Sequence, residues 1–192
     1  MSKTPSTFFN MVVTLFVVSL VSSGGVGWVY EVTKEPIEAS TLAKKTKAIE
    51  QVVPAFDNNP MNEKRVVEMD GGELAFYPIK KEGVLVGTAV ETFTDKGFGG
   101  RVKLMVGLLP DGSIKDIVVV EHKETPGLGD KMETKKSNFS GQFKGKNPAQ
   151  FKLMVKKDGG DVDAITAATI SSRAFCDALN RAYQTYMKEE NQ

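Results

Sequence analysis

Residues 102–120, VKLMVGLLPDGSIKDIVVV, decide the fold of this chain. Two apolar runs, residues 102–109 and 114–120, flank the tripeptide Pro110-Asp111-Gly112. Proline fixes one backbone angle, aspartate hydrogen-bonds to nearby backbone and glycine accepts a positive φ, so the tripeptide favours a tight turn. The stretch therefore predicts an antiparallel β-hairpin.

Further strand patterns lie on both sides of the hairpin. Residues 73–79 and 84–93 form strand-like runs that a short turn at residues 80–83 separates. Phe151, Leu153 and Val155 recur at every second position, which predicts a last, half-buried strand. The sequence thus predicts an antiparallel sheet made of short strands.

Helical periodicity occurs before and after the strands. Between Pro36 and Pro54, one face carries the residues Ala39, Leu42, Thr46, Ile49 and Val53. Near the C-terminus, residues recur every three or four positions: Phe175, Leu179, Ala182, Tyr183 and Tyr186. We therefore expect an α+β domain in which an early helix and a C-terminal helix pack on an antiparallel sheet.

Composition describes an ordinary globular chain and weakens several kinds of chemistry. Removing Lys3 from the 25 basic residues leaves 24 against 24 acids, so bulk charge gives no argument for nucleic acid. Cys176 is the only cysteine, which excludes an intrachain disulfide and a four-cysteine cluster from this chain alone. We expect it to be buried as a small hydrophobe. His122 is the only histidine, so a His-rich metal site is not expected.

Residues 8–30 contain no charged side chain. A helix of this length spans roughly 34 Å, enough for a hydrocarbon core of about 30 Å. Lys3 precedes the stretch, so the positive-inside rule places the N-terminus in the cytoplasm and the later residues outside. A cleaved signal peptide is the alternative, because residues 8–21 would also serve as its apolar core.

Small residues form a stripe on this expected transmembrane helix. Ser19, Ser23 and Gly27 are four positions apart, a spacing on which another membrane helix packs closely. The frequency of glycine in membrane helices explains the stripe equally well. The predicted segments are a cytoplasmic N-terminus at 1–7, the transmembrane helix at 8–30, a juxtamembrane helix and linker at 31–60, and the soluble domain at 61–192.

Two glycine-containing loops border the hairpin. Residues 97–100, GFGG, precede its first strand, and residues 122–130, HKETPGLGD, follow its second. Proline fixes φ and glycine frees it, so both loops are tightly shaped where the sheet ends. Each loop is either a structural turn or, since rigid scaffolds often present ligand-binding loops, part of a site.

Residues 163–172, DAITAATISS, place four hydroxyl side chains and one carboxylate ahead of the C-terminal helix. The plain explanation is that Ser171 or Ser172 caps that helix. The sharper hypothesis is a phosphate site, because a helix N-terminus offers free N–H groups and a positive dipole end. A hydrolase that uses Thr169 or Ser171 as nucleophile is disfavoured, since the single histidine makes an activating base hard to assign.

Residues 131–157 contain eight lysines and one acid, Glu133. A solvated face is the ordinary explanation for such a run. Binding of anionic lipid heads, of a partner or of a ligand phosphate is the functional alternative.

The two loops, the hairpin and residues 163–172 occur in an order that resembles the FMN-binding domain of ion-translocating electron-transport complexes. The chain resembles the G subunit of the Rnf complex and, more distantly, the C subunit of the sodium-pumping NADH:quinone reductase. The resemblance covers nearly the whole chain, including the N-terminal helix.

This resemblance implies a flavoprotein whose FMN is joined covalently, through its phosphate, to Thr169 by a separate flavin transferase. Asp163 and Thr166 match the family's attachment motif, and Ala167 stands where the family usually has glycine. That substitution costs stability if the position needs a positive φ. The residues implied to contact FMN are Thr169, Asp163, Thr166, Ala167, Ala168, Ile170, Ser171, His122, Glu124, Thr125, Pro126, Gly127, Leu128 and Gly129.

The implied role is that of an electron carrier in the Rnf complex, a membrane-bound ferredoxin:NAD oxidoreductase that translocates ions. The carrier would lack complete catalytic machinery and a metal site, and would be anchored in the cell (inner) membrane beside other subunits and lipid. Its soluble domain would be extracytoplasmic, in the periplasm where the cell has an outer membrane. The alternative is an anchored, non-redox binding or assembly module.

Overall fold

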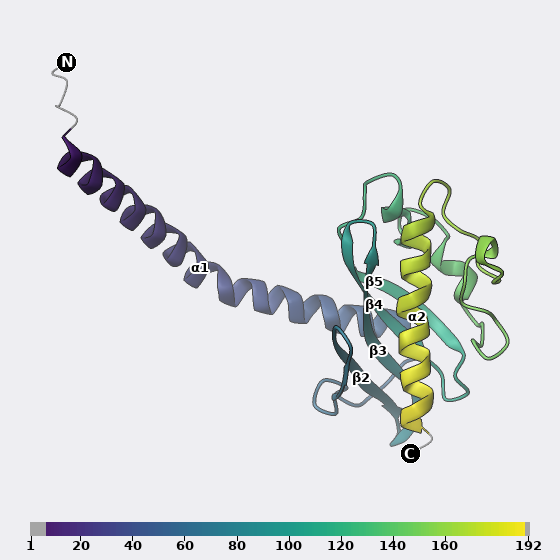
Figure 1. Cartoon of the computed structure of the whole chain (residues 1–192). Helices are drawn as coiled ribbons and strands as arrows, with labels where there is room; N and C mark the ends of the chain where they lie inside the picture. The colour runs from purple at the N-terminus through teal and green to yellow at the C-terminus, as the bar shows by residue number, and fades with distance from the viewer. Residues whose placement is uncertain (1–6, 191–192) are drawn as a thin grey trace. The chain divides into compact units, whose positions relative to one another are not determined.

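The computed structural model describes residues 7–190, and Figure 1 shows its helices and strands. The chain divides into two units, Met1–Lys44 and Lys45–Gln192. The expected cytoplasmic segment, including Lys3, lies almost entirely outside the described residues.

The first unit consists of most of helix α1, which spans Phe8–Val52. Its large apolar side chains, among them Phe16 and Trp28, are exposed. Among residues 7–190, α1 is the one helix long and apolar enough to cross a membrane, a test that a signal sequence also passes. The helix continues through Pro36, so the transmembrane helix expected at 8–30 and the helix expected after Pro36 form one continuous element. A proline removes one hydrogen bond and kinks a helix that the turns on both sides support.

The second unit is built on a five-stranded antiparallel sheet in which every strand pairs with its neighbour in sequence. Its strands are β1 (Arg65–Met69), β2 (Gly72–Lys81), β3 (Val84–Gly97), β4 (Gly100–Leu108) and β5 (Ile114–Glu121). The hairpin predicted from residues 102–120 is confirmed, with Leu108 opposite Ile114. At its turn, Asp111 accepts a hydrogen bond from the Ser113 amide (2.9 Å), and Gly112 has a φ of 79°.

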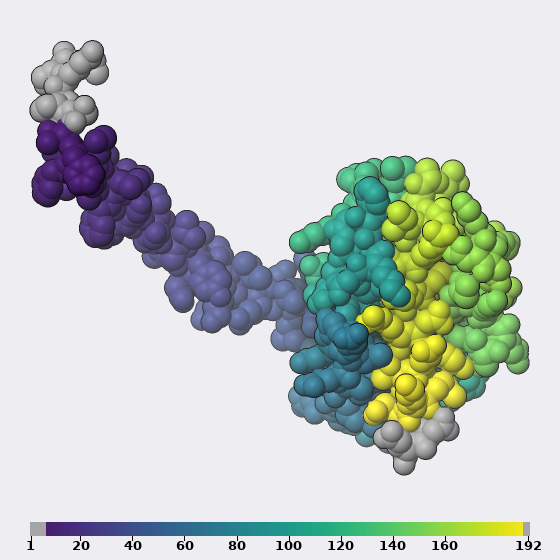
Figure 2. Space-filling model, viewed as in Figure 1, coloured from purple at the N-terminus to yellow at the C-terminus, as the bar shows by residue number. Residues whose placement is uncertain are grey.

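Helix α2 (Thr169–Glu190) packs on one face of the sheet. Its residues Phe175, Leu179 and Ala182 are buried in one cluster with the sheet residues Val90 and Leu104. Figure 2 shows the helix, in yellow, at the surface between strand residues in teal and the chain after β5 in green. The expected α+β domain is therefore confirmed.

The last turns of α1 cover the opposite face of the sheet. Ile49 and Val52 are buried there in a second cluster with Tyr77 and Met105. The helix approaches β4 so closely that a Cβ atom at Gly107 would lie 1.8 Å from the carbonyl oxygen of Val52. Glycine at this position therefore allows the early helix to pack on the sheet.

Between β5 and α2 the chain forms short 3₁₀ helices rather than a sixth strand. They are η1 (Gly129–Met132), η2 (Ser140–Phe143) and η3 (Lys156–Asp158). The strand expected around Leu153 was wrong: Val155 forms only an isolated bridge with Val162. Alternation reflected burial, since Leu153 and Val155 enter the core while the backbone of Met154 hydrogen-bonds two residues back to Lys152.

Lysines in this segment are mostly exposed, and several form surface ion pairs. Lys144 contacts Asp116 at 2.7 Å and Lys156 contacts Asp163 at 2.7 Å. Cys176 is buried on α2, and burial raises the pKa of its thiol to about 12. A thiol with so high a pKa is not a nucleophile at neutral pH, so its role is packing.

Candidate functional site

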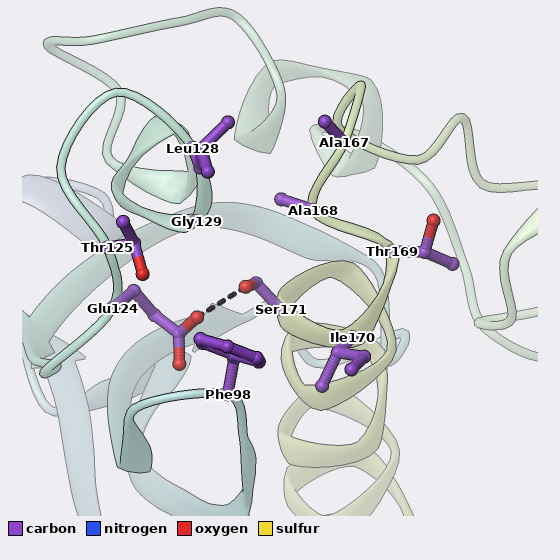
Figure 3. A pocket seen from close by; sticks show the side chains of 10 residues that line it. All are labelled: Phe98, Glu124, Thr125, Leu128, Gly129, Ala167, Ala168, Thr169, Ile170 and Ser171. Atoms are coloured by element: carbon purple, nitrogen blue, oxygen red, sulfur yellow. Dashed lines mark hydrogen bonds between the residues drawn. The ribbon is translucent and has the colours of Figure 1, made fainter.

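A cavity of about 340 Å³ lies where α2 begins, among three loops (Figure 3). The loops are the β3–β4 turn, the chain after β5, and the segment that leads into α2. The cavity is lined by Phe98, Glu124, Thr125, Leu128, Gly129, Ala167, Ala168, Thr169, Ile170 and Ser171. Its size falls within the range of small-molecule sites.

Glu124 joins the three loops. The amide of Gly99 donates a hydrogen bond to its Oε1 atom (3.0 Å), and the hydroxyl of Ser171 donates to its Oε2 atom, as the dashed line in Figure 3 marks. A Cβ atom at Gly129 would lie 2.5 Å from both the Glu124 carboxylate and the Ser171 hydroxyl oxygen. Glycine at position 129 therefore makes room for the hydrogen bond that connects the loop after β5 to α2.

His122 holds the same loop, the chain after β5, in place without lining the cavity itself. Its Nδ1 atom accepts a hydrogen bond from the Glu124 amide (3.1 Å), so the proton of the neutral ring is on Nε2, which contacts Glu133 at 2.7 Å. Hydrogen bonds from His122 and Lys136 hold the pKa of Glu133 below its ordinary value. Lys136 also contacts the buried Asp130 at 3.0 Å, so the ion pairs of Lys136 with Asp130 and Glu133 help to keep the backbone of the loop in place.

The helix begins earlier than the capping hypothesis requires. Thr169 is the first helical residue, and the carbonyl of Ala168 accepts the first intrahelical bond from the Ser172 amide (3.0 Å). Ser171 and Ser172 are therefore not N-caps, and this expectation was wrong. The Ser172 hydroxyl instead accepts from the Ile165 amide (2.9 Å) and donates to the Ala168 carbonyl (3.0 Å), which locks the preceding loop to the helix.

The first turn of α2 has free hydrogen-bond donors. Within residues 7–190, the amides of Thr169, Ile170 and Ser171 donate no hydrogen bond. The hydroxyl of Thr169 also makes none within that range, although the residue is half-buried and lines the cavity. Free amides at the positive end of a helix dipole bind anions, so this end of the cavity suits a phosphate.

Ala167 has a backbone φ of 60°, in the left-handed region. Position 167 thus has the conformation that favours glycine, the residue that the resemblance implies there. The side chain of Ala167 is exposed and lines the cavity. The fold tolerates the alanine at a conformational cost.

Five of the residues expected to bind a ligand do not line the cavity: Asp163, Thr166, His122, Pro126 and Gly127. Asp163 and Thr166 are exposed, and the Asp163 side chain pairs with Lys156. His122 contacts Glu124 and Glu133 but does not line the cavity. A ligand-binding role of any of the expected residues stays a prediction.

Phe98 lines the cavity but was not among the predicted site residues. It is 69% exposed in the β3–β4 turn, and Ile170 (48%) and Leu128 (40%) are also exposed at the cavity. Grouped exposed apolar side chains are typical of ligand sites. An aromatic residue between two glycines, in a turn that cannot bury it, was the signal in the sequence.

The cavity therefore has two chemically distinct parts. The start of α2 offers amides and the Thr169 hydroxyl, whereas Phe98, Leu128 and Ile170 offer apolar surface. In Figure 3, Thr169 lies on one side of the helix start and Glu124 on the other. Among the described residues, no group of three His, Cys, Asp or Glu side chains could hold a metal ion. The lining suits a ligand with a phosphate and a flat apolar body, which fits FMN.

Comparisons with known proteins agree with this description of the ligand. A family model for the FMN-binding domain matches residues 97–184, the range that contains every residue of the cavity. The chain is similar to the G subunit of the ion-translocating oxidoreductase complex of Haemophilus influenzae strain PittEE, with 36% identity over 85% of this chain and 81% of the relative. It is similar to the protein of the same name from Erwinia tasmaniensis, with 35% identity over 88% and 85%. The Vibrio cholerae O395 protein of that name is 32% identical over 93% and 89%.

Proposed function

Because this chain belongs to the family of the G subunits of ion-translocating oxidoreductase (Rnf) complexes, we propose that it carries electrons through FMN bonded by its phosphate to Thr169. As a member of that family, the chain is an electron-transport subunit of a multi-subunit complex and contains an FMN-binding domain. The covalent bond, the attachment residue and the placement in the membrane are the proposed part.

One observation carries the choice of Thr169. Of the four hydroxyl residues in residues 163–172, Ser171 and Ser172 are hydrogen-bonded to other groups and Thr166 lies outside the cavity lining. Thr169 lines the cavity, and its hydroxyl makes no hydrogen bond in the part of the chain that the structure describes. It is therefore the hydroxyl most available for modification.

Different residues of the cavity would hold different parts of FMN. The amides that open α2 would stabilise the phosphate, which keeps one negative charge as a phosphodiester. Phe98, Leu128 and Ile170 would cover part of the ring. When bound, FMN supplies the electron transfer chemistry, and the protein supplies position and electrostatics.

The attachment replaces one phosphorus–oxygen bond with another. The Thr169 oxygen bonds to the flavin phosphorus and loses its proton, while a phosphorus–oxygen bond to the leaving group of an activated flavin nucleotide breaks. A separate flavin transferase would catalyse this step. The covalent bond keeps the flavin at the site, since the tethered group cannot diffuse away.

Residues 8–30 of α1 would anchor the domain in the cell (inner) membrane, among lipids and the other subunits of the complex. The N-terminus would be cytoplasmic and the FMN-binding domain extracytoplasmic. The stripe formed by Ser19, Ser23 and Gly27 gives a neighbouring membrane helix a surface for close packing. Within the complex, the flavin would take part in electron transfer between ferredoxin and NAD that drives ion transport.

Mass spectrometry of the full chain, produced together with a flavin transferase, tests the attachment. Trypsin cleaves after Lys157 and Arg173 and releases residues 158–173, whose fragmentation separates Thr166 from Thr169. We expect the mass of FMN less one water on Thr169. Thr169→Val should remove flavin fluorescence from the denatured protein without loss of folding, because its volume is nearly kept.

Thr169→Ser is the matched control, since it keeps a hydroxyl at the same position and should keep the flavin. An unmodified peptide from the wild-type chain would refute the proposal. Protein that stays colourless although the transferase is active would support the non-redox binding or assembly module instead.

A further inference from the structure

Glu124 places a carboxylate in the cavity wall without a cationic partner. Its side chain lines the cavity and the residue is 5% exposed. Among the described residues, no ion pair involves Glu124, whereas the neighbouring acids Asp130 and Glu133 both contact Lys136. A buried carboxylate without a cation is costly unless hydrogen bonds and dipoles stabilise its charge.

Neutral groups stabilise this charge. The Gly99 amide can only donate, and the Ser171 hydroxyl is placed to donate to the other oxygen, so both partners match an ionised carboxylate that only accepts. Ser171 also belongs to the first turn of α2, where the positive end of the helix dipole favours a negative group. Hydrogen bonds and a dipole hold the charge but do not cancel it.

We propose that the fixed negative charge of Glu124 lowers the reduction potential of the flavin in this cavity. The inference rests on the proposed function, because it requires FMN in the cavity. Added electrons make the ring more negative, and a like charge nearby opposes this. The cavity wall screens the charge less than water would, so the reduced form is disfavoured relative to the oxidised form.

Glu124→Gln removes the charge and keeps the shape. The glutamine carbonyl can still accept from the Gly99 amide, and its NH₂ group can donate to the Ser171 oxygen, which changes from donor to acceptor. Gly97 and Gly129, which leave space for the carboxylate, leave the same space for the amide. The variant therefore separates charge from packing.

A spectroscopic redox titration of the flavin-loaded full chain at pH 8 measures the effect. At this pH the reduced flavin takes up fewer protons than at lower pH, so less of the negative charge that the electrons add is neutralised. We expect Glu124→Gln to raise the midpoint potential, so that the ratio of reduced to oxidised flavin at a fixed applied potential increases roughly tenfold or more. Glu121→Gln is the matched control: Glu121 is exposed, contacts Lys103 at 2.7 Å and does not line the cavity. It should shift the ratio by less than about twofold.

Thermal unfolding of both variants in the flavin-free Thr169→Val background gives the second readout. Glu124→Gln removes a buried charge that has no cationic partner and can keep both hydrogen bonds, so its melting temperature should be unchanged or higher. A purely structural role predicts the opposite pattern, with a lower melting temperature and an unchanged potential.

The outcomes distinguish the inference from the proposed function. If the wild-type chain carries no flavin, the proposed function fails and this inference fails with it. If Glu124→Gln carries flavin on Thr169 and its potential equals that of the wild type, only the inference is overturned. If that variant takes up no flavin although the wild type does, Glu124 acts in attachment, and the inference is again overturned.

Discussion

Replacing Ala167 with glycine should stabilise the domain, although it removes an apolar methyl group. Ala167 has a φ of 60°, which crowds its Cβ atom against the following carbonyl and costs an alanine roughly 1–2 kcal/mol. Glycine avoids this strain but makes the unfolded chain more flexible, which offsets about 0.4–1 kcal/mol. Because the side chain is exposed, little packing is lost. The net expectation is about 0.5–1 kcal/mol of stabilisation.

Urea denaturation followed by circular dichroism measures this difference as a shift of the midpoint at constant slope. The corresponding rise in melting temperature is about 1–4 °C for a domain of roughly 150 residues. Ala164→Gly is the matched control, because Ala164 is also exposed, lies in the same loop and has no positive φ. That variant should be destabilised by about 0.4–1 kcal/mol. The reasoning is refuted if the two variants shift the midpoint by the same amount or in the same direction.

Two further changes test the chain after β5, which forms one wall of the cavity. Gly129→Ala should lower the free energy of unfolding, measured by urea denaturation, by about 1–3 kcal/mol, because the new methyl group would overlap the Glu124–Ser171 hydrogen bond. A variant as stable as the wild type would contradict this. The hydrogen bond from His122 lowers the pKa of Glu133, so its contribution to stability is complete above the ordinary glutamate pKa, near 4.3, and is lost as the pH falls through the lower folded value. Melting temperatures measured from pH 7 to pH 3 should therefore fall less steeply for Glu133→Gln than for the wild type, and parallel curves would count against this contact.

Four of the five strands, all except β1, could be predicted from sequence because their signals are local. The Pro110-Asp111-Gly112 turn fixes the hairpin by its own backbone preferences, without help from distant residues. The strand expected at Leu153 failed for the opposite reason. Leu153 and Val155 are buried in the cluster that α2 and the sheet form, and Phe151 is partly buried against it, so tertiary packing imposed the pattern on a segment of short turns. An alternating pattern of apolar residues therefore indicates which side chains are buried, but it does not show that the backbone pairs with a neighbouring strand.

Part of the cavity lining was predicted for a similar reason, whereas ligand binding by these residues stays a prediction. Thr169 and the β5 loop follow from motifs that are continuous in sequence. The role of Ser171 could not be predicted, because the Glu124 carboxylate that receives its hydrogen bond is 47 residues away. Phe98 was missed because turn propensity explains its glycine neighbours without any ligand. Residues whose function depends on contacts between loops require the structure.

The first turn of α2 offers separate donors to the Glu124 carboxylate and to the phosphate of the proposed flavin. A helix N-terminus attracts any nearby negative group, so a buried carboxylate and a phosphate at the same end would compete for its amides. Here the carboxylate of Glu124 uses the side-chain hydroxyl of Ser171, and the backbone amides of Thr169 and Ile170 stay free of partners within residues 7–190. Ser172 directs its own hydroxyl back to the loop and does not reach the cavity. A serine at position 171, rather than an apolar residue, would therefore let one helix end hold the Glu124 carboxylate and still accept the phosphate of the proposed flavin.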